Sequence, residues 1–217
     1  MRPLARLTEV ACGSSVRALE EVTWGVVDQA TVAQVDALLR GRRSARVFGP
    51  GIPPEAEIRE ALEDAVYVPN HRRTQPWRFV VARGEALARL AARAGALKLR
   101  PGGGDELRAA AERTRQELQS AGYALAVLQK EAADPETREE DYAACILAAH
   151  QASLALWARG VAVRWSSGRI TADPEVRALL AAVQDERVAI LCYLGYPQAM
   201  PARPAPEPAS GRTLWLA

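Results

Sequence analysis

Three arginines and a serine lie within five residues in the segment Arg42-Arg43-Ser44-Ala45-Arg46. A guanidinium presents several N–H donors in a planar fork that can grip phosphate oxygens in pairs, and a serine hydroxyl adds a further donor. The segment therefore favours binding of a phosphate monoester. It is also compatible with a solvated basic turn, because short charge runs commonly lie on protein surfaces.

A polar loop enclosed by two prolines forms the second candidate, at residues 69–76. The prolines restrict the backbone at both ends, and the side chains between them, His71 among them, are polar. A rigid polar loop is well suited to hold a polar heterocycle. The alternative is a plain connector from a helix to a strand, with Trp77 and Phe79 as core anchors.

The third candidate is Trp165-Ser166-Ser167-Gly168-Arg169, at the end of an expected strand. Small residues let the backbone approach a ligand closely, and free N–H groups can face the electron-rich edge of a ring. An ordinary Ser/Gly turn is the alternative.

Hydrophobic periodicity and turn residues predict the elements that must position these segments. We expect helices over 31–41, 54–66, 84–97, from the Pro101–Gly104 break to about 120, over 138–159 and over 173–183, and strands over 77–82, 123–128, 161–167 and 188–194. Short apolar strands set between helices indicate a three-layer α+β arrangement.

The helix expected over 138–159 is apolar on most sides. Such a helix must be buried, either centrally or against another subunit. His150 within it fits a packed or interface histidine better than a catalyst.

Composition excludes several classes of protein. Of 217 residues, 49% are hydrophobic and 25% charged, and the net charge of +2 gives no basis for nucleic-acid binding. Three distant cysteines indicate reduced thiols, and two histidines argue against a histidine-built metal site. Without an apolar run near ~20 residues or a secretory signal, we expect a soluble cytoplasmic protein that does not enter membranes. The expected organisation is an extension over 1–30, one domain over 31–200 and a proline-rich tail over 201–217.

In their order and spacing, these segments resemble the nitroreductase family, particularly its short minimal members. Arg42–Arg46 matches the family's Arg-x-Ser-x-Arg/Lys motif. Val68–Asn70 and Gln75–Phe79 match its Ala-Pro-Ser/Asn/Asp and Gln-Pro-Trp-Arg-Phe segments, and Gly195–Pro197 matches its Gly-x-Pro signature. The resemblance covers roughly Val35 to Pro197.

The resemblance implies a nitroreductase-like fold, with a mostly antiparallel central sheet flanked by helices. It also implies an intertwined homodimer with FMN at the interface and each site drawing on both subunits. Helix 138–159 would form the dimer contact, and the tail would wrap the partner through Trp215 and Leu216. The implied cofactor-binding residues are Arg42, Arg43, Ser44, Arg46, His71, Trp165, Ser166, Ser167 and Arg203.

The implied activity is transfer of electrons from NAD(P)H to a nitroaromatic, quinone or similar small acceptor. Because the flavin carries the hydride, no catalytic acid or base is expected from the protein. The choice between NADH and NADPH stays open. Arg73 and Ser166 depart from the family pattern, which keeps a non-catalytic flavin-binding or flavin-delivery protein as an alternative. A basic helical scaffold that binds an acidic partner is a third interpretation.

Overall fold

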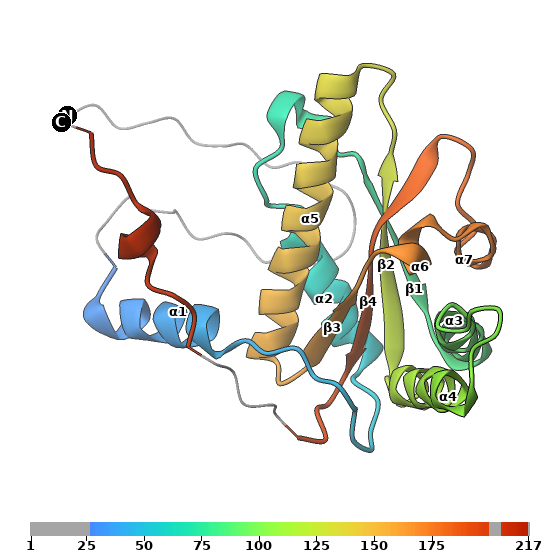
Figure 1. Ribbon diagram of the computed structural model, residues 1–217. Coiled ribbons are helices and arrows are strands. Elements are labelled where there is room, and N and C mark those ends of the chain that lie inside the picture. Colours follow the sequence, from blue (N-terminus) through green and yellow to red (C-terminus); the bar gives the residue numbers. More distant parts are fainter. Residues whose placement is uncertain (1–26, 200–204, 217) are drawn as a thin grey trace, which may run out of the picture.

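A computed structural model describes residues 27–199 and 205–216 of the chain (Figure 1). The helices are α1 (Gln29–Gly41), α2 (Glu55–Ala65), α3 (Gly84–Ala96), α4 (Asp105–Gln119), α5 (Pro135–Ala158), α6 (Arg169–Ala172) and α7 (Pro174–Leu179). Two 3₁₀ turns, η1 (His71–Arg73) and η2 (Ala209–Arg212), accompany the strands β1 (Trp77–Ala82), β2 (Tyr123–Lys130), β3 (Ala162–Ser166) and β4 (Glu186–Gly195).

The described elements form three layers, which confirms the predicted α+β class. The sheet has the order β1-β2-β4-β3, and all of its neighbouring strands are antiparallel. Helices α2 and α5 cover one face, and α3, α4, α6 and α7 lie on the other (Figure 1). All four predicted strands are present within a few residues of their expected limits.

The central strands β2 and β4 are buried along nearly their whole length. Their apolar runs lack the alternation of a half-exposed strand because both faces are covered by helices. Strand β3 pairs only with residues 191–195 of β4. Among the described residues, the first half of β4 therefore has no strand beside it on that side.

Helix α5 begins three residues earlier than the apolar pattern predicts. The Asp134 carboxylate accepts a hydrogen bond from the Thr137 amide at 2.8 Å, and Pro135 occupies the first turn. The Asp173 cap of α7 is confirmed, because its carboxylate accepts from the Val176 amide. That helix ends at Leu179 rather than near Val183, since Ala181 has a φ of 49°. The short helix α6 was not predicted.

One set of apolar residues remains open to solvent. Helix α1 has the predicted apolar face, yet within the described chain it buries none of its residues, and Leu39 is 50% exposed. Trp215 in the tail is 88% exposed. Helix α5 buries one side against α2 and the sheet and leaves Leu147 exposed.

None of the described helices is long and apolar enough to cross a membrane.

Candidate functional site

The segment at residues 42–46 follows the last turn of α1 and alternates in burial. The Ala45 methyl group is 1% exposed and belongs to the core, whereas Ser44 and Arg46 on either side of it are exposed. Anchoring of Ala45 in the core thus leaves the side chains on either side of it, Ser44 and Arg46, open to solvent. This arrangement suits a motif in which every second residue contacts a ligand.

Arg43 behaves differently from its neighbours. Its guanidinium donates to the carbonyl oxygens of Arg40, Gly41 and Arg42 at 2.6, 2.9 and 3.0 Å. These carbonyls at the end of α1 have no helical amide to accept from, and the arginine satisfies them. The structure therefore gives Arg43 a capping position beside the predicted phosphate cluster.

The Gly195-Tyr196-Pro197 segment holds the basic segment in place. The Gly49 amide donates to the Tyr196 carbonyl at 2.8 Å, and Phe48 forms a bridge with Pro197. A side chain at Gly195 would place its Cβ 2.9 Å from the Phe48 ring. The glycine is thus required for close packing, and the signature fixes the loop that presents Ser44 and Arg46.

The end of β3 borders a small cavity of about 140 Å³. Its polar lining comes from the strand end and from the α3–α4 side, namely Lys98, Thr114, Arg164, Ser166, Ser167 and Arg169. Gly168 has a φ of 79°, a conformation that favours glycine, and it turns the chain from the strand into α6. The cavity is smaller than the roughly 300–1,000 Å³ of typical ligand pockets, so this chain alone does not enclose a large ligand there.

Trp165 lies on the other side of β3 from this cavity. Its indole N–H donates to the Ser153 hydroxyl of α5 at 3.1 Å, and its ring packs in the α2–α5 core. Strand alternation separates it from Ser166. A ligand in the cavity could therefore meet the backbone of Trp165, while the side chain anchors the strand to α5.

Glu117 of α4 joins the basic segment to β3. Its carboxylate accepts from Arg164 at 2.9 Å and lies 3.6 Å from the Arg46 guanidinium, and Arg164 also donates to the Arg46 carbonyl at 2.8 Å. The structure thus brings residues 42–46 and 164–169 into one region. Glu117, Arg164 and Lys98 were not predicted, because a lone charged residue on a helix, strand or turn has no distinguishing sequence pattern.

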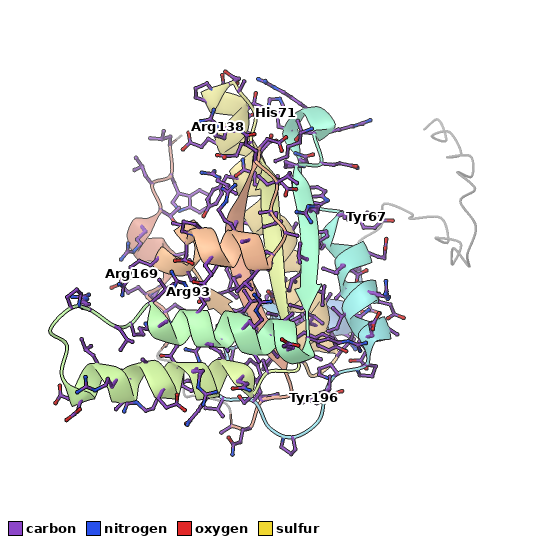
Figure 2. All side chains as sticks on the ribbon, turned by 90° about the vertical axis from the view of Figure 1, so that its right-hand side faces the viewer. Tyr67, His71, Arg93, Arg138, Arg169 and Tyr196 are labelled. Atoms are coloured by element: carbon purple, nitrogen blue, oxygen red, sulfur yellow. The ribbon has the colours of Figure 1, made fainter. Side chains whose placement is uncertain are left out.

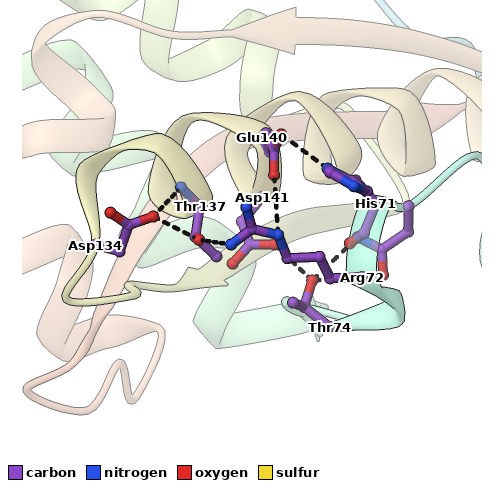
Figure 3. A network of polar contacts seen from close by, with 8 residues as sticks. His71, Arg72, Thr74, Asp134, Thr137, Glu140 and Asp141 are labelled. Carbon is purple, nitrogen blue, oxygen red and sulfur yellow. Dashed lines mark hydrogen bonds and ion pairs between the residues drawn. The ribbon is translucent and has the colours of Figure 1, made fainter.

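The polar loop at residues 70–75 is fastened to the first turns of α5 (Figure 3). His71 Nδ1 lies 2.8 Å from Glu140 Oε1, and Arg72 donates to the Thr137 hydroxyl at 2.7 Å. The Thr74 hydroxyl donates to the Asp141 carboxylate at 2.5 Å. The predicted rigid loop is therefore held by side chains as well as by its prolines.

The backbone of this loop is strained. Arg72, Arg73 and Gln75 have φ angles of 61°, 52° and 45°, in a region that residues other than glycine rarely adopt. The Asn70 side chain stabilises the turn by accepting from the Gln75 amide at 2.7 Å. Strain of this kind persists where surrounding contacts enforce it, and it is concentrated at functional sites.

The loop and the basic segment lie at opposite ends of α5. Glu140 contacts His71 near the start of the helix, whereas Trp157 near its end is close to Gly41. Glu140 and Trp157 are 17 positions apart in the helix, or about 25 Å along the axis. In Figure 2, His71 and Tyr196, which contacts the loop just after the basic segment, accordingly lie at opposite ends of the molecule. One chain does not bring His71 to the other predicted site residues, and Arg203 lies outside the described residues.

The sequence pattern of the nitroreductase family matches residues 39–196. The YfhC protein of Bacillus subtilis (strain 168) is 32% identical over 175 residues, which cover 76% of this chain and 84% of the relative. YdjA of Escherichia coli (strain K12) is 29% identical over 164 residues, which cover 74% of this chain and 87% of the relative.

Solved structures have the same fold. A nitroreductase-like family protein from Bacillus cereus superposes with a TM-score of 0.73 at 22% identity, covering 84% of this chain and 95% of that structure. The FMN-dependent nitroreductase NfnB from Mycobacterium smegmatis, in complex with NADPH, gives a TM-score of 0.67 at 22% identity and covers 86% of this chain and all of that one. The chain belongs to the nitroreductase family.

Proposed function

We propose that the protein is a homodimeric, FMN-dependent oxidoreductase that passes electrons from NAD(P)H to a nitroaromatic, quinone or similar small acceptor. Membership of the nitroreductase family supports oxidoreductase function in general. YfhC and YdjA are provisionally named NAD(P)H nitroreductases, and NfnB is described as FMN-dependent and bound to NADPH. These relatives support the flavin and the electron donor proposed here.

The residues of this chain fit the flavin. Ser44 and Arg46 are both exposed on an anchored loop beside Arg42, and their hydroxyl and guanidinium groups would hold the phosphate. The backbone of residues 165–167 would meet an edge of the ring. When bound, FMN supplies the group that accepts a hydride from the donor and returns electrons to the acceptor.

Positive charge at the cavity supports a redox role. Lys98, Arg164 and Arg169 line it, and fixed cations stabilise negative charge that develops on a bound ring system. Glu117 neutralises part of this charge through Arg164. The remaining cations favour a ligand that gains electrons.

One observation supports the dimer above all others: the predicted site is divided between the two ends of α5. An FMN molecule held at residues 42–46 is too short to reach His71 of the same chain, about 25 Å along the helix. A second copy running antiparallel across α5 would bring His71 of the partner subunit to the ring. The exposed apolar residues of α1, α5 and the tail provide surface for that contact.

The test begins with the absorbance spectrum of the freshly purified protein, which we expect to show bound flavin. Anaerobic mixing with NADPH or NADH should then bleach the flavin, and adding a nitroaromatic or a quinone should restore its colour. A yellow protein that neither reductant bleaches at millimolar concentration would support the alternative of flavin binding or delivery. A colourless protein that takes up no FMN would overturn both proposals.

A further inference from the structure

A second and larger cavity lies away from the proposed flavin site. It is a groove of about 610 Å³ beside the first half of β4, where that strand has no neighbour among the described strands. One wall comes from the start of α5 and the other from α6 and α7; the lining includes Arg138, Tyr142, Thr171, Arg177, Arg187 and Val188. Arg138 is labelled near the top of Figure 2. The volume falls within the usual range for ligand pockets.

The three arginines of this groove are held by neutral acceptors. Arg138 donates to the carbonyls of residues 132 and 133, at 2.9 and 3.1 Å. Arg177 donates to the Val183 carbonyl at 3.2 Å, and Arg187 donates to the Gln129 side chain at 2.7 Å. Within residues 27–199 and 205–216, the closest carboxylate oxygen paired with any of them is that of Glu131, 3.9 Å from Arg187.

Several arginines elsewhere in the described chain are instead paired closely with a carboxylate. Arg78, Arg93 and Arg115 each donate to a carboxylate within 2.7 Å. The groove thus gathers three guanidiniums that donate to no carboxylate among the described residues, with Glu139 in its lining. The charges of Asp134 and Glu186, near Arg138 and Arg177, offset part of this positive charge. Such a cluster attracts an anion, and each planar fork can grip a phosphate.

The Arg187 guanidinium is held in place by two residues, Gln129 and Tyr142. Gln129, which accepts from it, is fully buried and donates in turn to the Arg138 carbonyl at 2.7 Å. The Tyr142 ring lies 4.8 Å from the Arg187 guanidinium, within the range of a cation–π contact. A guanidinium held this way loses little freedom when it binds a ligand, which favours affinity.

The groove is on a different side of α5 from the exposed apolar face. Tyr142 and Leu147 are five residues apart, which is about 140° around the helix axis. The expected dimer contact through Leu147 therefore does not require the groove to be covered. The groove also adjoins the proposed flavin cavity, because Arg169 and Ile170 line the cavity while Thr171 and Ala172, later in the same helical turn, line the groove.

We propose that the groove binds the adenosine 2′-phosphate end of NADPH while the nicotinamide lies at the flavin, an inference that rests on the proposed function. A phosphate monoester carries up to two negative charges and three acceptor oxygens, which match three guanidiniums better than the ribose hydroxyls of NADH do. Pro135, Val188 and Ala189 provide apolar surface for the adenosine. The one-turn helix α6 separates the two ends of the donor.

The direct test is calorimetric titration of the FMN-loaded protein with adenosine 2′,5′-bisphosphate, with 5′-AMP and inorganic phosphate in parallel. We expect the bisphosphate to bind more tightly than either of the others. Arg177→Gln and Arg187→Gln should each weaken its binding about tenfold, the usual cost of a charge-assisted hydrogen bond. Arg113→Gln, which removes an exposed arginine from α4, serves as the matched control and should leave binding unchanged.

Steady-state kinetics provide a second readout. In both groove variants, KM should rise for NADPH and change little for NADH. The value of kcat at saturating donor should stay the same as in the parent protein. Unchanged bisphosphate binding in both variants would overturn the proposal, as would inorganic phosphate binding as tightly as the bisphosphate. If the protein takes up no FMN but still binds the bisphosphate, and Arg177→Gln and Arg187→Gln weaken that binding, the nucleotide site is retained and the flavin function is removed. The two failures are therefore distinguishable.

Discussion

The helical layers on the two faces of the sheet bury their apolar side chains to different degrees. On one face of the sheet, α3 places Leu87 and Leu90 in the core, both at most 4% exposed, and packs closely on α4. On the other face, α5 buries one side and leaves Leu147 at 42% exposure, and α1 buries nothing within the described chain. One layer is finished by the chain itself, whereas the other presents apolar surface.

This difference matches the division of the candidate site. The site residues that one chain brings together lie where β3 contacts α4 through Arg164 and Glu117, beside the finished layer. The His71 loop is fastened to α5, in the unfinished layer. Monomeric proteins rarely leave several large apolar side chains open on one face, so a second copy is the simplest way to cover the layer and complete the site.

Placing a charge on the open face should have the largest effect. A guanidinium at Leu147 cannot be buried without a partner, so Leu147→Arg should prevent dimer formation and, with it, retention of FMN. Light scattering after size-exclusion chromatography gives the mass, and absorbance gives the flavin content. Val183→Arg, at a position 55% exposed near α7, is the control and should remain a yellow dimer. A monomeric Leu147→Arg protein with full FMN content would contradict the divided site.

Mixing two defective chains tests the division directly. Arg42→Ala with Ser44→Ala removes the proposed phosphate contacts, and His71→Ala with Glu140→Ala removes the contact that fastens the loop to α5. A heterodimer of the two variants should contain one intact site and one that lacks both sets, because each site takes one set from each subunit. Differently tagged chains, coexpressed and purified through both tags, should then regain reductase activity at one of two sites. Failure of every heterodimer to exceed the parent homodimers would place both sets in one subunit.

Much of the fold followed from local pattern. The apolar runs at residues 77–82 and 188–194 predicted strands because their side chains fit a buried pleated surface, and the structure contains both. Asp173 also predicted the start of α7, because a carboxylate at that position accepts from an amide of the first helical turn, here that of Val176. The start of α5 was missed, because the polar first turn that Asp134 caps has no apolar period to detect.

The site was less accessible from sequence. Residues 42–46 and 165–169 could be singled out because several polar groups are adjacent in each. Lys98, Glu117 and Arg164 lie far apart in the sequence, in the turn after α3, in α4 and in β3, and only the fold brings two of them beside Arg46. The capping position of Arg43 depends on the carbonyls at the end of α1, which sequence pattern does not reveal.

A substitution in the finished layer should lower the stability of the protein without changing its FMN content. A Cβ at Gly95 of α3 would lie 2.7 Å from the Ala111 carbonyl of α4, so Gly95→Ala must push the helices apart. We expect a loss of about 1–3 kcal/mol in the free energy of unfolding, measured by urea titration, with unchanged FMN content. Gly104→Ala, where the added methyl group meets open space, is the matched control. Loss of FMN in the folded Gly95→Ala protein would show that the two layers are coupled.

An effect of similar size, but one that depends on pH, is expected at the ion pair of Arg78 and Glu186, at the edge of the sheet. The Glu186 carboxylate accepts from Arg78 at 2.6 and 2.7 Å and is 8% exposed, and these hydrogen bonds hold its pKa below the usual value. A carboxylate with a lowered pKa in the folded state stabilises the protein above its unfolded pKa of about 4.3, and this contribution is lost as pH falls through the folded pKa. Because Arg78 is 43% exposed, Glu186→Gln should cost only roughly 2 kcal/mol at pH 7. Urea titrations at pH 7 and below pH 4 should show this difference shrinking; a constant difference would contradict it.

The smallest expected change is a pKa shift at His150, on the open side of α5. Desolvation lowers the pKa of this histidine, and the nearby charge of Arg42 lowers it further. If Arg42 holds the FMN phosphate, the added negative charge offsets that of the arginine, and the pKa of His150 should rise when FMN binds. NMR titration of the imidazole can follow it, because the chain has only one other histidine, and His71→Gln assigns the signal. In an Arg42→Ala protein the pKa should already be raised without FMN. A His150 pKa that stays the same or falls on FMN binding would place the phosphate away from Arg42.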